Sequence, residues 1–344
     1  MRLRLDVALF AVCLSAAAQG AGSIADLVGD VRAGIEGHRS DSQMAKSVRK
    51  IKLSERLDDR TIEILQSEGA GPETVSQLLL LRDRSSALPR PAKAAIEEPP
   101  PPSPAEQQQI WNAAHENSLS YTESLPDFIC SEVVRRYTDP NAKGAWRLAD
   151  TLVLKLTYFD RQEDYKLMTV NNHSTSLSYE QMGGAITEGE FGSMLAAVFA
   201  LKSRTNRSWD HWTILRSRPT HVYSFSIAAA NSDYRITSGS SRRDEEKVAA
   251  GQRGYIYIDA STKMVTRVTA AADGLPRDFP VRKVDLLLDY DFIDVGGRHY
   301  LLPLHSETQL DAPPFQHRNE TDFLAYRKFS ADATITFDGT VKKD

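Results

Sequence analysis

Two carboxylates near the C-terminal end of the chain have the spacing that acid–base chemistry uses. Asp289 and Asp291 alternate with Leu288, Tyr290 and Phe292, so both carboxylates project from one face of a predicted strand. Such a pair can act in general acid–base catalysis or bind calcium. A half-buried strand shows the same alternation, with polar residues on its solvent-exposed face. No neighbouring loop supplies the further oxygen ligands that calcium needs. We therefore predict a solvated sheet face at this position.

The histidines and cysteines offer little more chemistry. His299 and His305 are six residues apart in a predicted strand, so they could share a face, but about 20 Å of extended chain separates them. Cys130 lies in the apolar segment PDFICSEVV, where a thiol has little thiolate character. No nucleophile elbow, H-E-x-x-H, phosphate-binding glycine loop or C-x-x-C motif is present. We predict no catalytic residue, no metal and no cofactor, with an envelope hydrolase using Asp289 or His299 as an open alternative.

The first residues, 1–20, have the order of a secretory signal peptide. Arg2 and Arg4 precede an apolar run from Val7 to Ala18, and small residues follow, with cleavage after Ala18 or Gly20. The run is too short for a permanent membrane anchor, and no second apolar stretch approaches membrane length. We expect a mature protein without a transmembrane segment, located in the periplasm or secreted.

Residues 23–88 are predicted to form a small helical domain, because apolar residues recur there at helical spacing. The segment SEGAGPETVSQLLLL within it resembles a helix-hairpin-helix, an element that many proteins use to bind nucleic-acid backbones. Glu73 occupies the place where such hairpins usually carry a cation, and the whole chain has a formal net charge of −4. We therefore interpret Gly69 and Gly71 as a tight turn between packed helices and predict no nucleic-acid partner.

Residues 89–104 are predicted to be a proline-rich linker, with seven prolines in PRPAKAAIEEPPPPSP. Proline-rich chain is extended and semi-rigid, so a spacer is favoured over a docking site for a partner. At its end Ser103, Pro104 and Glu106 combine a capping serine, a first-turn proline and a glutamate. A helix should run from there to about Ser124.

Residues 105–340 are predicted to form one further domain, in which apolar and polar positions alternate from about Phe128 to Phe337. Turn signals at Asp259-Ala260-Ser261-Thr262 and Asp294-Val295-Gly296-Gly297 separate these runs as hairpins would. The run over 194–201 is apolar almost all round and must be buried against the sheet or plug a cavity. The predicted class is α+β, with a small helical domain followed by a curved antiparallel half-barrel and covering helices.

Two segments resemble a known superfamily. GYIYIDASTKMVTRVTAAADGLP and LLLDYDFIDVGGRHYLLPLHSET look similar to successive hairpins of the periplasmic lipoprotein carriers (LolA/LolB-like). SYTESLPDFICSEVVRRY and GEFGSMLAAVF also resemble uncharacterised exported proteins of acidobacterial type. The carrier resemblance extends from the Ser103 helix onward. It implies a curved open sheet whose concave apolar face is covered by helices and can take up acyl chains.

On that basis we expect a non-enzymatic protein that holds a lipid or a lipidated ligand by burial alone. The candidate ligand-binding residues are large side chains expected to point inward: Leu152, Leu154, Tyr223, Phe225, Tyr255, Tyr257, Leu286, Leu288, Phe191 and Met194. A filled core would use the same residues. A second alternative is an interaction or sensor module, in which the helical domain binds an envelope protein and the linker sets its reach.

Overall fold

The computed structural model describes residues 21–91, 100–141, 146–182, 193–216, 218–238 and 246–329. The chain forms two compact units, Met1–Glu97 and Glu98–Asp344. The predicted signal peptide lies outside the described residues, as do Phe191 and the alternating residues beyond Phe329. Within the described ranges, no helix combines the length and the apolar character that membrane crossing requires.

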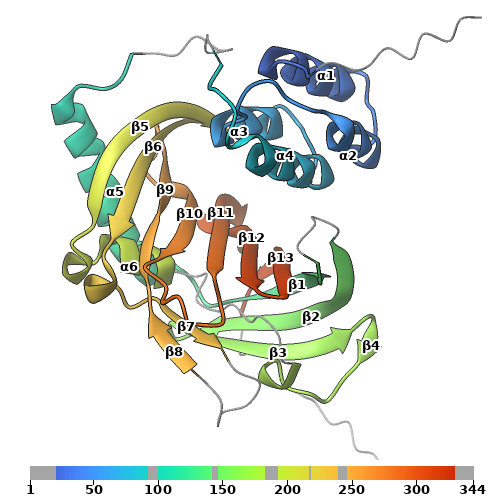
Figure 1. Cartoon of the computed structure of the whole chain (residues 1–344). Helices are drawn as coiled ribbons and strands as arrows, with labels where there is room; N and C mark the ends of the chain where they lie inside the picture. The colour runs from blue at the N-terminus through green and yellow to red at the C-terminus, as the bar shows by residue number, and fades with distance from the viewer. Residues whose placement is uncertain are drawn as a thin grey trace, which may run out of the picture. The chain divides into compact units, whose positions relative to one another are not determined.

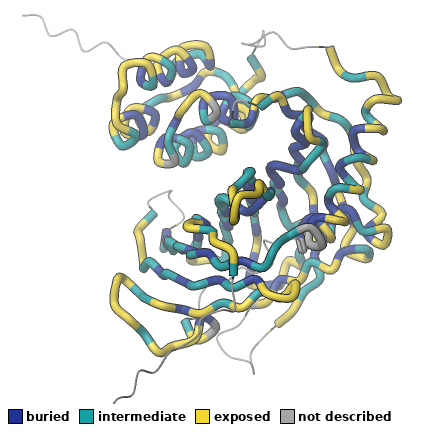
Figure 2. Tube along the Cα trace, turned by 180° about the vertical axis from the view of Figure 1, so that it is seen from behind, coloured by how far each residue is buried: buried dark blue, intermediate teal, exposed yellow. Residues whose placement is uncertain are grey.

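The first unit contains four helices, α1 (Ile24–Glu36), α2 (Asp41–Lys50), α3 (Asp59–Ser67) and α4 (Pro72–Ser85). Side-chain oxygens of Ser23, Ser40 and Asp58 accept hydrogen bonds from the first turns of α1, α2 and α3, which satisfies amides that a helix start leaves unpaired. Figure 2 shows buried stretches on these helices. The core contains the predicted stripe of α1 together with side chains from the other helices: Ile24, Leu27, Val28, Val31, Val48, Leu57, Ile62, Leu65, Leu78 and Leu81.

The glycine turn before α4 is occupied by a carboxylate of this chain. Asp41 accepts hydrogen bonds from the backbone amides of Glu73 and Thr74 at 2.8 and 3.0 Å. Gly71 permits that approach, because a Cβ there would lie 2.4 Å from the Asp41 Cγ. Gly69 has φ +115°, a conformation that favours glycine. The amides that would bind a phosphate in a nucleic-acid-binding hairpin therefore serve the packing of α2 against α4.

The second unit begins with α5 (Pro104–Ser124), which has the predicted capping box between Ser103 and Glu106. Short helices η1 (Glu180–Met182), α6 (Ser193–Phe199), η2 (Leu201–Ser203) and η3 (Ala229–Asn231) lie between the strands. The strands are β1 (Phe128–Asp139), β2 (Arg147–Phe159), β3 (Gln162–Val170), β4 (His173–Ser174), β5 (Asn206–Leu215), β6 (Arg218–Ile227), β7 (Arg235–Ser238), β8 (Glu246–Ala249), β9 (Gly251–Asp259), β10 (Val265–Asp273), β11 (Lys283–Asp294), β12 (His299–Ala312) and β13 (Phe315–Lys328).

Over the described residues, eleven of these strands form one sheet in the order β4-β3-β2-β1-β13-β12-β11-β10-β9-β6-β5. All its pairings are antiparallel. The two ends of this order, β4 and β5, do not pair with each other, and Figure 1 shows the strongly bent strands of an open sheet. β7 and β8 form a separate hairpin. The predicted α+β class with a curved half-barrel is therefore confirmed.

The pairing register defines two faces of this sheet, since directly paired residues project to the same side. One row of partners runs Tyr223, Ile256, Val268, Leu288, Ser306, Thr321, Val134 and Leu152. Side chains of α5 and α6 pack on this side of the sheet, which we call the helix-covered face. The other side, which carries Tyr257, Arg267, Asp289, His305 and Asp322, is called the opposite face.

Candidate functional site

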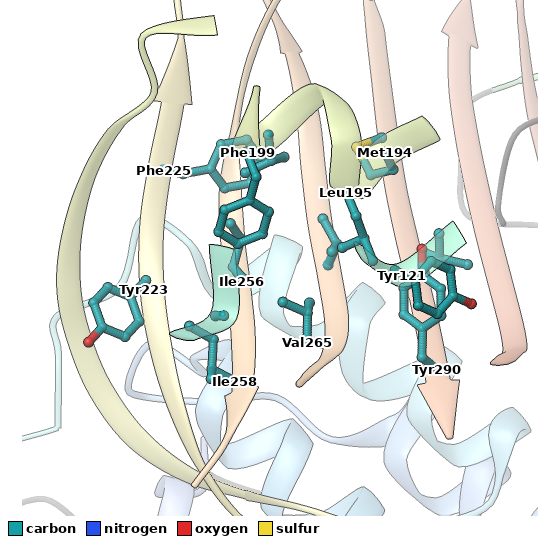
Figure 3. Packing of buried hydrophobic residues seen from close by; sticks show 14 of the residues in the cluster. Tyr121, Met194, Leu195, Phe199, Tyr223, Phe225, Ile256, Ile258, Val265 and Tyr290 are labelled. Carbon is teal, nitrogen blue, oxygen red and sulfur yellow. The ribbon is translucent and has the colours of Figure 1, made fainter. Parts of the chain in front are cut away.

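The largest apolar cluster of the second unit lies on the helix-covered face. Two helices and five strands contribute to it, as Figure 3 shows for part of the set. Its buried members are Ile110, Trp111, Ala114, Tyr121, Met194, Leu195, Val198, Phe199, Tyr223, Phe225, Ile227, Ile256, Ile258, Val265, Val268, Ala270, Leu288, Tyr290 and Leu301.

Helix α5 is fixed to the sheet by aromatic contacts and one hydrogen bond. The Trp111 ring lies 5.5 Å from that of Tyr223, and the Tyr223 hydroxyl donates to the Gln107 carbonyl at 2.8 Å. Near the other end of the helix, the rings of Tyr121 and Tyr290 meet edge to face at 5.9 Å. Sequence reasoning missed this contribution, although Ile110, Trp111, Ala114 and Tyr121 have the spacing of a helical stripe.

Helix α6 has only seven residues, yet Met194, Leu195, Val198 and Phe199 are all buried in the cluster. The Phe199 ring lies 4.9 Å from Trp111, so α6 packs on α5 as well as on the sheet. The predicted burial of this segment is confirmed for those side chains. It is wrong for Leu201, which is 91% exposed, because the helix ends at Phe199 and the chain turns into η2.

Apart from Phe191, the predicted ligand-binding residues fall into three groups. Tyr223, Phe225, Leu288 and Met194 belong to the cluster, and Leu286 packs at its margin. Phe191 lies outside the described residues.

Leu152 and Leu154 share the helix-covered face but form a separate cluster at the β1–β3 end of the sheet, with Val134, Leu167 and Tyr179.

The inward placement predicted for Tyr255 and Tyr257 is wrong. Tyr257 pairs with Val222 while its neighbour Ile256 pairs with Tyr223, so both tyrosines project from the opposite face. Both contribute to a small cluster with Leu215 and Val222. The physical reason is that β9 carries large apolar side chains on both of its faces.

A buried amide side chain lies beside the apolar cluster on the helix-covered face. Gln252, on β9, is 2% exposed. Its Nε2 lies 3.9 Å from the Met194 sulfur, and among the described residues its Oε1 has no hydrogen-bond partner.

A groove of about 220 Å³ lies at the strands β13, β1, β2 and β3. It is lined by Ile129, Cys130, Ser131, Val153, Leu154, Lys155, Met168, Ala325 and Arg327. Ile129, Ser131, Val153 and Lys155 project from the opposite face, so this groove is not the hollow that the sequence predicts.

Asp289 is buried in an ionic network, so its predicted solvated position is wrong. Arg267 donates to it through Nε and Nη2 at 2.7 and 2.8 Å, and Arg216 Nη1 lies 3.2 Å from its Oδ1. Burial raises the pKa of Asp289, but the two guanidiniums outweigh that effect and the net pKa lies below its ordinary value. Asp291 projects from the same face, 3.4 Å from Arg216 Nε. Both carboxylates lie beside the Arg216 guanidinium, and the buried Asp289 carboxylate is also paired with Arg267.

His299 and His305 lie on opposite faces, contrary to the predicted shared face. A β-bulge shifts the register of β12, because Asp289 pairs with His305 while Tyr290 pairs with Pro303, and one extra residue reverses the alternation. His305 Nδ1 lies 2.8 Å from Asp322 Oδ1. Burial lowers the pKa of His305, but Asp322 and Asp289 together raise it above its ordinary value.

The structure gives the Cys130 thiol no reactive character. The side chain is 1% exposed, and burial, with the charge of Glu132, raises its pKa to about 12. Over the described ranges, His, Cys, Asp and Glu side chains form no group of three that could hold a metal ion.

No protein-family model matches this chain, and no curated protein matches it. Solved structures do align with it. A DUF1329 family protein from Desulfovibrio piger is 10% identical and covers 64% of this chain and 93% of its own, with a TM-score of 0.29. A domain assigned to outer membrane lipoprotein sorting, from Vibrio parahaemolyticus, is 12% identical over 66% of this chain and 94% of its own, with a TM-score of 0.31.

The MucA/MucB complex of Pseudomonas aeruginosa aligns at 8% identity over 64% of this chain and all of the matched chain, with a TM-score of 0.20. At such identities and TM-scores these likenesses carry no argument about function. The half-barrel assignment rests on the strand order and register above.

Proposed function

We propose that this chain is an exported, non-enzymatic binding protein that holds a lipid acyl chain, or a lipidated protein segment, on its helix-covered face. The observation that supports this proposal is the packing of the short helix α6 on the sheet. A seven-residue helix is marginal in water by itself, yet it supplies four buried apolar side chains to the sheet. An acyl chain offers the same kind of surface, so it can take the place of α6.

The gross energies of this exchange are similar in size. Exposing four large apolar side chains costs about 6–12 kcal/mol, at roughly 1.5–3 kcal/mol each. Burying about ten methylenes gains on the order of 8 kcal/mol before association entropy is subtracted. Net binding therefore requires a longer acyl chain, or a helix α6 that is packed less tightly on the sheet.

A fluorescence titration with a dansyl-labelled fatty acid tests the proposal on the full chain. Leu195 is 1% exposed and anchors α6, so Leu195→Ala weakens the competing helix by about 2–5 kcal/mol. We expect that variant to bind the probe at least tenfold more tightly than the wild type. Ile256→Glu places a charge on the sheet beneath and should abolish binding.

Ala196 is exposed on α6, and Ala196→Ser is the matched control that should leave the affinity unchanged. Hydrogen exchange of residues 193–199 should speed up when ligand is added, while β9 stays protected. Absence of saturable binding to both the wild type and Leu195→Ala would refute the proposal.

The alternative of a partner-binding helical unit stays a prediction. The apolar side chains of α1–α4 are used in that unit's own core, and all the large exposed hydrophobic side chains found in the described residues lie in the second unit. The hydrolase alternative gains no support, because Asp289 is held between two arginines.

A further inference from the structure

The helix-covered face contains a polar group that its apolar packing does not need. Gln252 projects from this face, since it pairs with Ile227 on β6 and with Ala272 on β10. Only 2% of its surface is exposed. Burying an amide without hydrogen bonds is unfavourable, so stability alone favours leucine or methionine at this position.

The contacts of Gln252 leave its hydrogen-bonding capacity largely unused. The amide nitrogen faces the sulfur of Met194 at 3.9 Å, and thioether sulfur is a weak acceptor. Within the part of the chain that the structure describes, the amide oxygen accepts no hydrogen bond. A buried polar atom in this state calls for a reason such as a missing ligand.

We infer that the ligand of the helix-covered face carries a hydroxyl or amide group on its acyl chain, and that the side-chain amide of Gln252 binds this group. The inference rests on the proposed function. Met194 belongs to α6, so a ligand that replaces α6 also displaces the Met194 sulfur. The ligand then lies against the Gln252 amide in place of the sulfur. A hydroxyl or an amide group can both donate and accept a hydrogen bond. The Gln252 side chain can accept through its oxygen and donate through its nitrogen.

The positions next to Gln252 on this face carry small residues. The next two positions toward the cluster on this face are Gly254 and Ala270, which pair with each other. Neither has a side chain large enough to fill the space that α6 occupies. A ligand lying across this small-residue surface reaches Gln252 at one end and Phe225 beside it, because Phe225 pairs with Gly254.

Competition against the dansyl-labelled fatty acid tests the inference. Three competitors of equal chain length are compared: a plain fatty acid, a 3-hydroxy fatty acid and an N-acyl amide. One hydrogen bond gained in a buried site predicts that the wild type prefers the hydroxyl or the amide compound by roughly three- to tenfold. The competitor that shows the preference distinguishes a hydroxylated lipid from an amide-linked acyl chain.

Gln252→Leu should reduce that preference to about one while the plain fatty acid binds at least as well as before. Gln309→Leu, on the opposite face, is the matched control and should retain the preference. A thermal melt of each variant, with Gln252→Met as the closer isostere, verifies that the fold is intact. Plain and polar competitors binding equally to the wild type would overturn this inference and leave the proposed function standing. Failure of every competitor and of the probe itself would instead refute the proposed function.

Discussion

Replacement of Asp289 by alanine should destabilise the second unit strongly, although its side chain projects from the opposite face and is not part of the apolar cluster under α5 and α6. The Arg267 and Asp289 side chains are only 3% and 4% exposed, and two parallel hydrogen bonds join them. Arg216 adds a second cation at 3.2 Å. Removing the carboxylate leaves the Arg267 guanidinium buried without its counter-charge.

Breaking a buried pair in this way costs about 3–5 kcal/mol. The upper half of that range is expected, because the bond is bidentate and Arg216 loses a partner as well. For a domain of this size each kcal/mol lowers the melting temperature by roughly 2–4 °C, so a decrease of about 8–20 °C follows. The total free energy of unfolding of a domain is only about 5–15 kcal/mol, and the variant should therefore be marginal.

Urea denaturation followed by circular dichroism measures the change. Asp291→Ala is the matched control, since Asp291 is 33% exposed and lies 3.4 Å from Arg216, and it should cost less than about 1 kcal/mol. The double variant Arg267→Met with Asp289→Leu should recover most of the loss, because it removes both charges. Equal small losses for Asp289→Ala and Asp291→Ala would refute the assignment of Asp289 to a buried structural pair.

Further predictions concern backbone packing and pH. Gly254→Ala should destabilise by at least about 1–3 kcal/mol in the same denaturation assay, because its Cβ would meet the Thr269 carbonyl oxygen at 1.9 Å. Asp41→Ala should cost about 0.5–2 kcal/mol in a melt of the first unit, since the variant loses the cap of α4. Burial raises the pKa of Asp322, but His305 and Arg135 lower it overall to about 2. The contribution of Asp322 to the free energy of unfolding is therefore present above pH 3.8 and should be lost as the pH falls toward 2. Asp322→Asn should flatten that part of the plot of stability against pH. The pKa of His305 is raised, so its contribution to the free energy of unfolding is complete below pH 6.5 and declines as the pH rises through the folded-state pKa. If His305→Gln has the same dependence of stability on pH as the wild type, this prediction is wrong.

Alternation predicted which residues share a face within one strand, because the two-residue period is local. It did not predict which of two apolar faces points toward the helices. On β9, Tyr255 and Tyr257 alternate with Ile256 and Ile258, and each set is large and apolar. The choice depends on the pairing of β9 with β6, which is a long-range property.

The bulge in β12 shows a second limit of the sequence. His299 and His305 have the spacing of a shared face, but one extra residue opposite β11 reverses the alternation between them. The burial of Asp289 also depends on strand pairing, in this case between β10 and β11. Its partner Arg267 was visible in the preceding hairpin, yet only the register places the two side chains directly opposite each other.

The start of helix α5, in contrast, depends on short-range signals and was predicted from the sequence. Ser103, Pro104 and Glu106 define the start of α5 as the sequence indicates. The apolar stripe of α5 is harder to predict, because polar residues are also frequent in this helix. The role of the stripe follows from long-range contacts, those of Trp111 with Phe199 and Tyr223.

The proposed exchange of α6 for a ligand requires that the rest of the half-barrel keeps its shape. If a ligand replaces α6, the apolar contacts on the helix-covered face change, and something else must keep the strands paired and bent. The opposite face carries ionic pairs between neighbouring strands: Arg267 with Asp289 joins β10 to β11, His305 with Asp322 joins β12 to β13, and Arg135 with Asp322 joins β1 to β13. None of these pairs involves α6, so the frame that they stabilise does not depend on what occupies the helix-covered face.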